Sequence, residues 1–166
     1  VSHNMIEYSF SALPEAEQEK IMETLNTFMT QQLKAYETFD SSVVTLGTAE
    51  YRETLEQAFQ KMQNENFRKV GTLMESTYHL EDLRTPVINE ETGLYELEIK
   101  GKFIMKEDHY LDDLRTTNQL EAYNDFLIKA TYVPEEQGWM VKQAEEHSPF
   151  VFNYAEAKTY TFDQSE

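Results

Sequence analysis

The spacing of the apolar residues changes its period midway along the chain, and this change constrains the fold more than any other feature of the sequence. From residue 14 to residue 74, apolar residues recur at intervals of three and four, which predicts amphipathic helices. From residue 77 onward they alternate with polar residues, which predicts strands that bury one face. Helices followed by consecutive strands are typical of the α+β class. We therefore expect N-terminal amphipathic helices that pack on an antiparallel sheet of about four strands.

Helical segments are expected in the first part of the chain. The first is predicted to run from Pro14 to Phe39, with a break at residues 40–42. Thr48 is the expected N-cap of the second, because its hydroxyl can accept a hydrogen bond from a backbone N–H of the first turn. The second apolar stripe continues through Phe67 to Met74 after a polar interruption at residues 64–66. This stripe predicts either one bent helix or two helices.

The second part is expected to form strands joined by short turns. We predict strands near Thr77–Leu83, Leu94–Glu107, Leu120–Tyr132 and Trp139–Gln143, with turns at Asn89–Gly93 and Pro134–Gly138. The inner face, which contacts the helices, is expected to carry Tyr95, Leu97, Ile99, Phe103, Met105, Phe126, Ile128, Trp139 and Val141 against Leu25, Phe28, Met29, Leu55, Phe59 and Met62. Its polar atoms are expected only from Tyr95, Asn124, Tyr132 and Gln143, with no His, Asp or Glu. A core filled with side chains is therefore predicted.

The order of these elements, the long strand around residues 94–107 and the sequence Gly138-Trp139-Met140-Val141 resemble the nuclear transport factor two-like superfamily. The resemblance covers residues 14–147 and implies a cone in which helices pack into the concave face of a curved sheet. The superfamily includes isomerases and dehydratases. It also includes non-catalytic domains, such as ectodomains of membrane-anchored bacterial proteins and assembly factors of conjugation (type IV secretion) machines. This chain has no clear hairpin between its helices, which is closer to the conjugation-factor variant.

The predicted cone domain is flanked by two further segments. Residues 1–13 are expected to be an N-terminal extension. Residues 148–166 form an aromatic tail in which Phe150, Phe152, Tyr154, Tyr160 and Phe162 alternate with other residues. This tail is either an edge strand of the domain itself or a strap that a partner orders.

Composition excludes several classes of function. The chain has 31 acidic and 14 basic residues, a net charge of −17, which argues against binding to nucleic acid or to anionic lipid. It has no cysteine, which excludes disulfides, thiol catalysis and cysteine-ligated zinc. No apolar run approaches the roughly 20 residues that span a bilayer, so this segment is not expected to insert into a membrane.

The sequence supplies little catalytic chemistry. Enzymes of the superfamily use carboxylates, tyrosines or histidines that project from the concave sheet face, and the predicted inner face has no titratable acid, base or histidine. Glu107, Asp108, Asp112 and Asp113 surround His109 in sequence, but their spacing matches no metal motif, and a solvated acidic loop is the expectation. We expect no metal and no cofactor.

One short sequence occurs twice. The segment from Tyr78 to Thr85 recurs, with its aromatic pair swapped, as the segment from His109 to Thr116. In one interpretation, each copy is the point where the chain leaves a strand, with its leucine in the core. In the other, these two strand ends lie side by side and present a rim to a ligand or partner. The candidate binding residues are Tyr78, His79, Asp82, Arg84, His109, Tyr110, Asp113, Arg115, Phe150 and Phe152.

The sequence thus favours a non-catalytic binding or assembly domain with a protein partner or a second copy of itself. The resemblance and the lack of cysteine favour the exported part of an anchored Gram-positive protein at the cell surface, with a cytoplasmic location as the alternative. The alternative function is a small-molecule isomerase or dehydratase, with Tyr78, His79, Asp82, His109 or Tyr110 at the mouth of the cone. A third interpretation, an acidic mimic of nucleic acid, would need carboxylates along one face, whereas here they are evenly spread.

Overall fold

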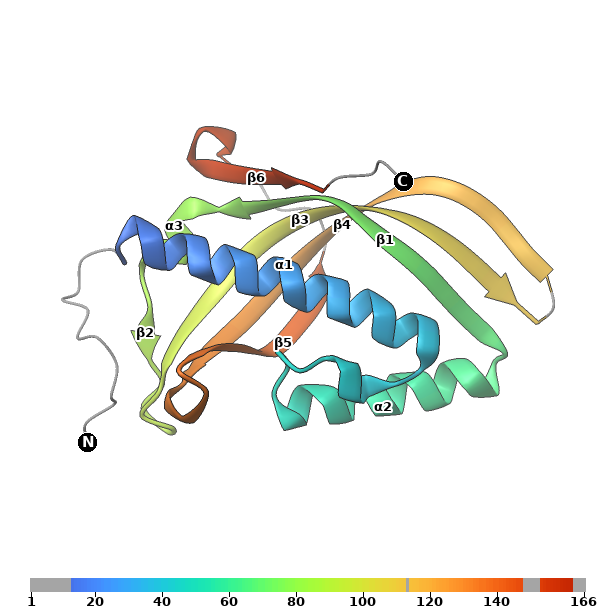
Figure 1. Cartoon of the computed structure of the whole chain (residues 1–166), viewed down its shortest axis with the longest axis horizontal. Helices are drawn as coiled ribbons and strands as arrows, with labels where there is room; N and C mark the ends of the chain where they lie inside the picture. The colour runs from blue at the N-terminus through green and yellow to red at the C-terminus, as the bar shows by residue number, and fades with distance from the viewer. Residues whose placement is uncertain (1–12, 113, 148–152, 163–166) are drawn as a thin grey trace.

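The chain folds into two layers, with the N-terminal helices lying across one face of a curved antiparallel sheet (Figure 1). A computed structural model describes residues 13–112, 114–147 and 153–162, and for residues 114–123 and 154 it describes the backbone alone. The predicted α+β class is confirmed. The sheet has six strands, two more than expected.

The helical layer contains α1 (Glu15–Thr38), the short 3-10 helix η1 (Ser41–Val43) and α2 (Ala49–Asn64). Helix α1 ends where Phe39 adopts a left-handed backbone conformation with φ of 56°. The Thr48 hydroxyl accepts a hydrogen bond from the Tyr51 backbone N–H at 3.2 Å, which confirms the predicted N-cap of α2. No helix among the described residues combines the length and the apolar character that crossing a membrane requires.

Strand β1 (Phe67–His79) corrects the prediction of a helix that continues to Met74. Asn66, with φ of 52°, turns the chain out of α2. The register of β1 with β3 then shifts between Leu73 and Glu75, so Met74 is an extra residue in a β-bulge. Val70 lies on the opposite face to Phe67 and Leu73, and Met74 follows directly as the extra residue, so the apolar residues of β1 do not alternate.

Helix α3 (Leu80–Arg84) follows β1 and corrects a second prediction. It occupies most of the segment Thr77–Leu83, where a strand was predicted. The remaining strands are β2 (Val87–Ile88), β3 (Tyr95–Leu111), β4 (Leu114–Val133), β5 (Gly138–His147) and β6 (Ala157–Thr161), with 3-10 helices η2 (Pro134–Glu136) and η3 (Tyr154–Glu156). The strand order is β5-β4-β3-β1-β6, and β2 pairs with β3. The long strand and both predicted turns are confirmed.

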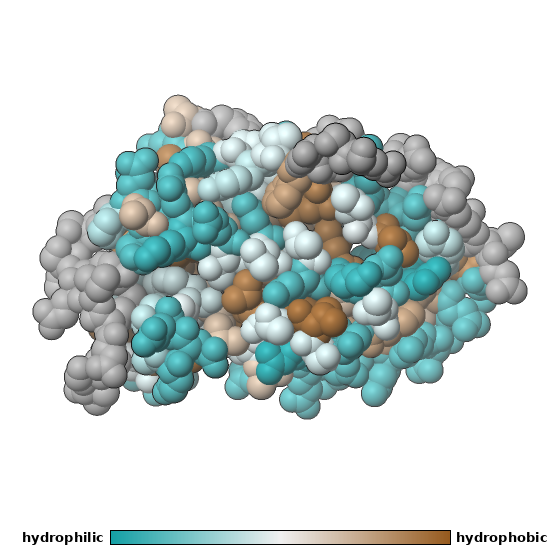
Figure 2. Space-filling view, in the orientation of Figure 1, coloured by the Kyte–Doolittle hydropathy of each residue, from teal (hydrophilic) through white to brown (hydrophobic). Residues whose placement is uncertain are grey.

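A single core lies between the two layers. All the residues predicted to meet there are buried, except Tyr95, which is half-buried and packs against the others. At its centre the ring of Phe103 has edge contacts with Tyr78 and Phe126, at centroid distances of 5.7 and 5.4 Å. The outer surface over α1 is mostly hydrophilic, with small and separate apolar patches (Figure 2). Apolar side chains therefore gather between the layers.

Strand β6 places part of the aromatic tail on the edge of the domain's own sheet. It pairs with β1 from Glu75 opposite Thr161 to His79 opposite Ala157. The hydroxyls of Thr77 and Thr159 lie 2.9 Å apart across this pair. Phe150 and Phe152, predicted as binding residues, lie outside the described residues.

Candidate functional site

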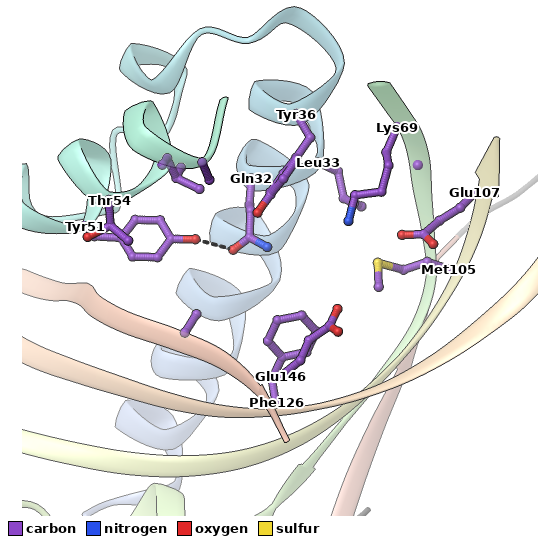
Figure 3. A pocket seen from close by; sticks show the side chains of 14 residues that line it. Gln32, Leu33, Tyr36, Tyr51, Thr54, Lys69, Met105, Glu107, Phe126 and Glu146 are labelled. Atoms are coloured by element: carbon purple, nitrogen blue, oxygen red, sulfur yellow. Dashed lines mark hydrogen bonds between the residues drawn. The ribbon is translucent and has the colours of Figure 1, made fainter. Parts of the chain in front are cut away.

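A cavity of about 300 Å³ lies between the helices and the sheet (Figure 3). We call it the central cavity. Helices α1 and α2 form one side, and strands β1, β3, β4 and β5 form the other. Its lining includes Gln32, Leu33, Tyr36, Tyr51, Leu55, Lys69, Met105, Glu107, Phe126 and Glu146. The cavity therefore combines apolar walls with both positive and negative side chains.

Two carboxylates reach the central cavity, so the prediction of an inner face without Asp or Glu is wrong. Glu107 continues the inward alternation of Phe103 and Met105 by one more step, and this signal was present in the sequence. Glu146 has no such signal, because it depends on a register shift. Lys129 pairs with Gln143 but Ala130 pairs with Val141, so Lys142 is an extra residue in β5.

The same shift turns Gln143 outward, and its exposed side chain corrects the prediction that it faces inward. Ala144 and Glu146 face the helices instead. A single inserted residue thus decides which side chains of β5 reach the cavity.

The tyrosines of the cavity stay protonated near neutral pH. The Tyr51 hydroxyl donates a hydrogen bond to Gln32 Oε1 at 2.5 Å, and burial raises the pKa of this hydroxyl. Burial, and then the negative charge of Glu146, raise the pKa of the Tyr36 hydroxyl. Neither phenol is therefore suited to act as a general base, which must lose its proton.

The charged groups of the cavity contact neighbouring side chains. Lys69 Nζ lies 4.8 Å from the centroid of the Tyr36 ring, a cation–π contact. Glu107 Oε2 lies 3.3 Å from Nε2 of His109, and the Glu107 side chain is only 14% exposed. Tyr36, Lys69 and Glu107 surround one space in Figure 3. The central cavity therefore presents an ammonium group, two carboxylates and phenol hydroxyls to the same space.

Tyr78 belongs to the core, which corrects its prediction as a surface binding residue. Its side chain is fully buried, and its hydroxyl donates to Asn26 Oδ1 at 2.5 Å. The Ser76 hydroxyl donates to the same oxygen at 2.6 Å. Burial raises the pKa of the Tyr78 hydroxyl. The hydroxyls of Ser76 and Tyr78 therefore both have a hydrogen-bond acceptor inside the core, beside Phe103.

The two copies of the repeated segment lie at opposite ends of the sheet, so they do not form one rim. Tyr78 pairs with Gly101 of β3, whereas Phe67 pairs with Leu111. Ten residues of β3 separate Gly101 from Leu111, roughly 33 Å along a strand. The first copy leads into α3 and buries Leu83, while the equivalent Leu114 begins β4.

The other predicted binding residues divide between these two ends. Asp82 and Arg84 lie on α3, which begins directly after His79. At the other end, Cζ of Arg68 lies 4.6 Å from the centroid of the Tyr110 ring. The rings of His109 and Phe67 make a T-shaped contact with their centroids 5.6 Å apart. Asp113 lies outside the described residues, and for Arg115 only backbone pairing with Tyr110 is described. At the α3 end, His79, Glu81 and Glu156 offer atoms that could hold a metal ion, within 4.8 Å of one another.

The helices on a curved sheet and the cavity between them define an NTF2-like domain. Residues 21–145 match the family model of the YvbJ NTF2-like domain, so the chain belongs to that family. A search of the curated proteins found no match.

Two solved structures resemble this fold. One is the intermembrane space region of the chloroplast protein ARC6, with a TM-score of 0.57 and 6% sequence identity, over 82% of this chain and 100% of that one. The other is a periplasmic fragment of TraM, with a TM-score of 0.51 and 12% identity, over 80% of this chain and 98% of that one. At these identities the likeness shows the fold alone.

Proposed function

We propose that this domain is a non-catalytic binding domain that recognises a protein partner, carried outside the cytoplasm by a membrane-anchored bacterial protein. The observation that supports it is the packed part of the interior beside the central cavity. Tyr78, Asn26 and Ser76 form a closed buried network there, beside the packed ring of Phe103. This part of the concave face is therefore core, while Lys69, Glu107 and Glu146 line the central cavity beside it.

An open depression at the outer end of β1 and β3 supports a protein partner. It is lined by Phe39, Gln63, Asn66, Phe67, Arg68, Tyr110 and Asp112. The neighbouring Leu111 is 49% exposed. Aromatic residues and arginine are enriched in the centres of protein interfaces. We call this the hairpin-end surface, because it adjoins the turn between β3 and β4.

The net charge favours a different protein over a second copy as the partner. Each copy carries −17, so two copies repel each other. The hairpin-end surface, in contrast, presents Arg68. A partner that is less acidic than this domain avoids this repulsion.

A photo-crosslinking amino acid at Tyr110 of the full-length protein, in its native cells, tests this binding surface. We expect an adduct with one discrete protein, and we expect Arg68→Glu to reduce it. The matched control carries the same amino acid at Glu91, in the exposed turn at the other end of β3. Adducts of equal yield from both positions, or a dimer of the chain as the sole product, would contradict the proposal.

Labelling of one introduced cysteine tests the location. The solved neighbours are an intermembrane space region and a periplasmic fragment, which supports a location outside the cytoplasm. The chain has no cysteine of its own, so Glu91→Cys provides a single thiol in this domain. We expect a membrane-impermeant maleimide to label it in intact cells, with the unsubstituted protein as the control for other thiols. Labelling only after lysis would contradict this location.

The central cavity favours a second candidate function, the binding or conversion of a small molecule by an isomerase or dehydratase. Its volume of about 300 Å³ is at the lower end for ligand pockets. The described lining includes none of Tyr78, His79, Asp82, His109 and Tyr110, so this function would use Lys69, Glu107 and Glu146 instead. Ligand-observed NMR with small polar compounds tests it. Binding that Lys69→Met abolishes would favour this candidate, and no binding would exclude it for those compounds.

A further inference from the structure

One histidine and two glutamates, each from a different element, meet where the C-terminal segment joins the sheet. His79 is the last residue of β1, Glu81 lies in α3, and Glu156 ends η3 just before β6. One ligand atom from each lies within 4.8 Å of the other two. His79 Nε2 and Glu156 Oε2 are 3.8 Å apart. These are the atom types that bind a divalent transition metal.

A carboxylate also lies beside the second ring nitrogen of His79. His79 Nδ1 faces Asp82 Oδ1 at 3.4 Å, and Asp82 Oδ2 accepts a hydrogen bond from the Lys100 backbone N–H at 2.9 Å. A carboxylate beside the second ring nitrogen fixes the tautomer and orients the ring of a metal ligand. With Nδ1 held toward Asp82, Nε2 is directed to the side of Glu156.

We propose that His79, Glu81 and Glu156 bind a divalent cation of the zinc class. One imidazole and two carboxylates, with water as a fourth ligand, match the ligand set of open zinc sites. Ligand atoms in a tetrahedral zinc site lie about 3.3 Å apart, as follows from bonds of about 2.0 Å. Glu81 is exposed and the Glu156 side chain is 46% exposed, so both can close the remaining gap. Calcium and magnesium are poorer candidates, because they prefer oxygen ligands alone.

The bound ion would fasten the C-terminal segment to the rest of the domain. Glu156 belongs to η3, which leads directly into β6, whereas His79 ends β1 and Glu81 lies in α3. A metal ion that bridges them joins both sides of the β1–β6 pair at its first rung, His79 opposite Ala157. Metal binding is therefore expected to lower the rate at which β6 separates from β1.

Isothermal titration of the 166-residue chain with zinc chloride tests the site. We expect one high-affinity site, and at least a tenfold weaker affinity in both His79→Gln and Glu156→Gln. Asp82→Asn should weaken binding about 10–100-fold, as is usual for the partner of a metal-binding histidine. The matched control is His109→Gln, which removes another histidine that lies 3.3 Å from a glutamate and should leave the affinity unchanged.

Hydrogen exchange of the β6 backbone provides a second readout. We expect zinc to slow exchange at residues 157–161 in the unsubstituted chain and not in Glu156→Gln. If His79→Gln fails to fold, Glu156→Gln and Asp82→Asn still decide the question, because Glu156 is on the surface. Zinc affinity that Glu156→Gln leaves unchanged, an equal loss in His109→Gln, or tighter binding of calcium than of zinc would each overturn the proposal.

Discussion

At the scale of single residues, Asn26 has more influence on this fold than its small side chain suggests. Its Oδ1 atom accepts hydrogen bonds from Ser76 and Tyr78, which lie on the opposite layer. All three side chains are buried. A buried donor that loses its acceptor keeps the full cost of desolvation. Asn26 therefore makes it possible to place two hydroxyls inside the cone.

Replacing Asn26 with leucine should accordingly be costly. We expect Asn26→Leu to lower the free energy of unfolding by about 2–4 kcal/mol, because two buried hydroxyls lose their acceptor. Tyr78→Phe is the matched comparison, since it removes one donor and leaves the Ser76 hydrogen bond in place. Its cost should be smaller, about 1 kcal/mol. Urea denaturation measures both, and equal midpoints for the two variants would contradict this account.

Glu96 is expected to link stability to pH. Burial opposes its ionisation, but hydrogen bonds from Lys142 Nζ at 2.7 Å and Asn89 Nδ2 at 3.0 Å outweigh burial and lower the pKa of the carboxyl. Because the pKa is lower in the folded than in the unfolded state, the stabilisation is present above about pH 4.3 and is lost as pH falls through the folded pKa.

Glu96→Gln tests this link. We expect the variant to be less stable than the unsubstituted chain at pH 7, with a difference that shrinks toward pH 3. Chemical denaturation at several pH values measures it, with Glu98→Gln, an exposed neighbour on β3, as the control. A difference that stays constant over this range would show that Glu96 acts through packing alone.

At the scale of elements, the sequence predicts regular alternation well and inserted residues poorly. Strand β3 was predicted correctly because its inward positions follow a strict period of two, and Glu107 was visible in that same pattern. Strand β1 was mistaken for a helix because Val70 lies on the opposite face to Phe67 and Leu73 and because Met74 is inserted. Glu146 was missed because Lys142 is inserted. Pairing between His79 and Glu156 depends on a contact 77 residues apart, which no local spacing reveals.

Strand β6 is expected to protect the outer edge of β1. Truncation after His147 should leave the edge of β1 that faces β6, from Glu75 to His79, without a pairing strand. Such an edge pairs readily with another chain, so we expect the truncated domain to dimerise or aggregate. Size-exclusion chromatography with light scattering measures this, and removal of residues 163–166 alone is the control. A truncated chain that remains monomeric and equally stable would show that β6 is dispensable.

At the scale of the whole molecule, charge works against compactness. The net charge of −17 is carried by one small domain, and described ion pairs such as Lys20 with Glu17 and Lys34 with Glu37 are on the surface. Exposed pairs of this kind contribute little to stability. The hydrophobic core between the layers must therefore offset the mutual repulsion of the carboxylates.

Salt should consequently stabilise the domain. We expect the melting temperature at neutral pH to rise as sodium chloride increases from 10 to 500 mM, because the Debye length falls from about 30 Å to below 8 Å and screens the repulsion. Differential scanning calorimetry measures this. The same salt series at pH 4.5, near the isoelectric point, is the control, since the net charge to be screened there is close to zero. A melting temperature that falls with salt would show that attractive pairs outweigh the repulsion.

The position of β6 also has a consequence for the order in which this protein is made. Thr77 in β1 must wait for Thr159 in β6, its partner 82 residues later. At about 5–20 residues per second, the ribosome takes roughly 4–16 s to supply that partner. The helices and the first strands can form in this interval, but the outer edge of β1 is covered only after residues 157–161 have been synthesised. During these seconds the nascent domain carries an unpaired strand edge, which is the kind of surface that pairs wrongly with other chains.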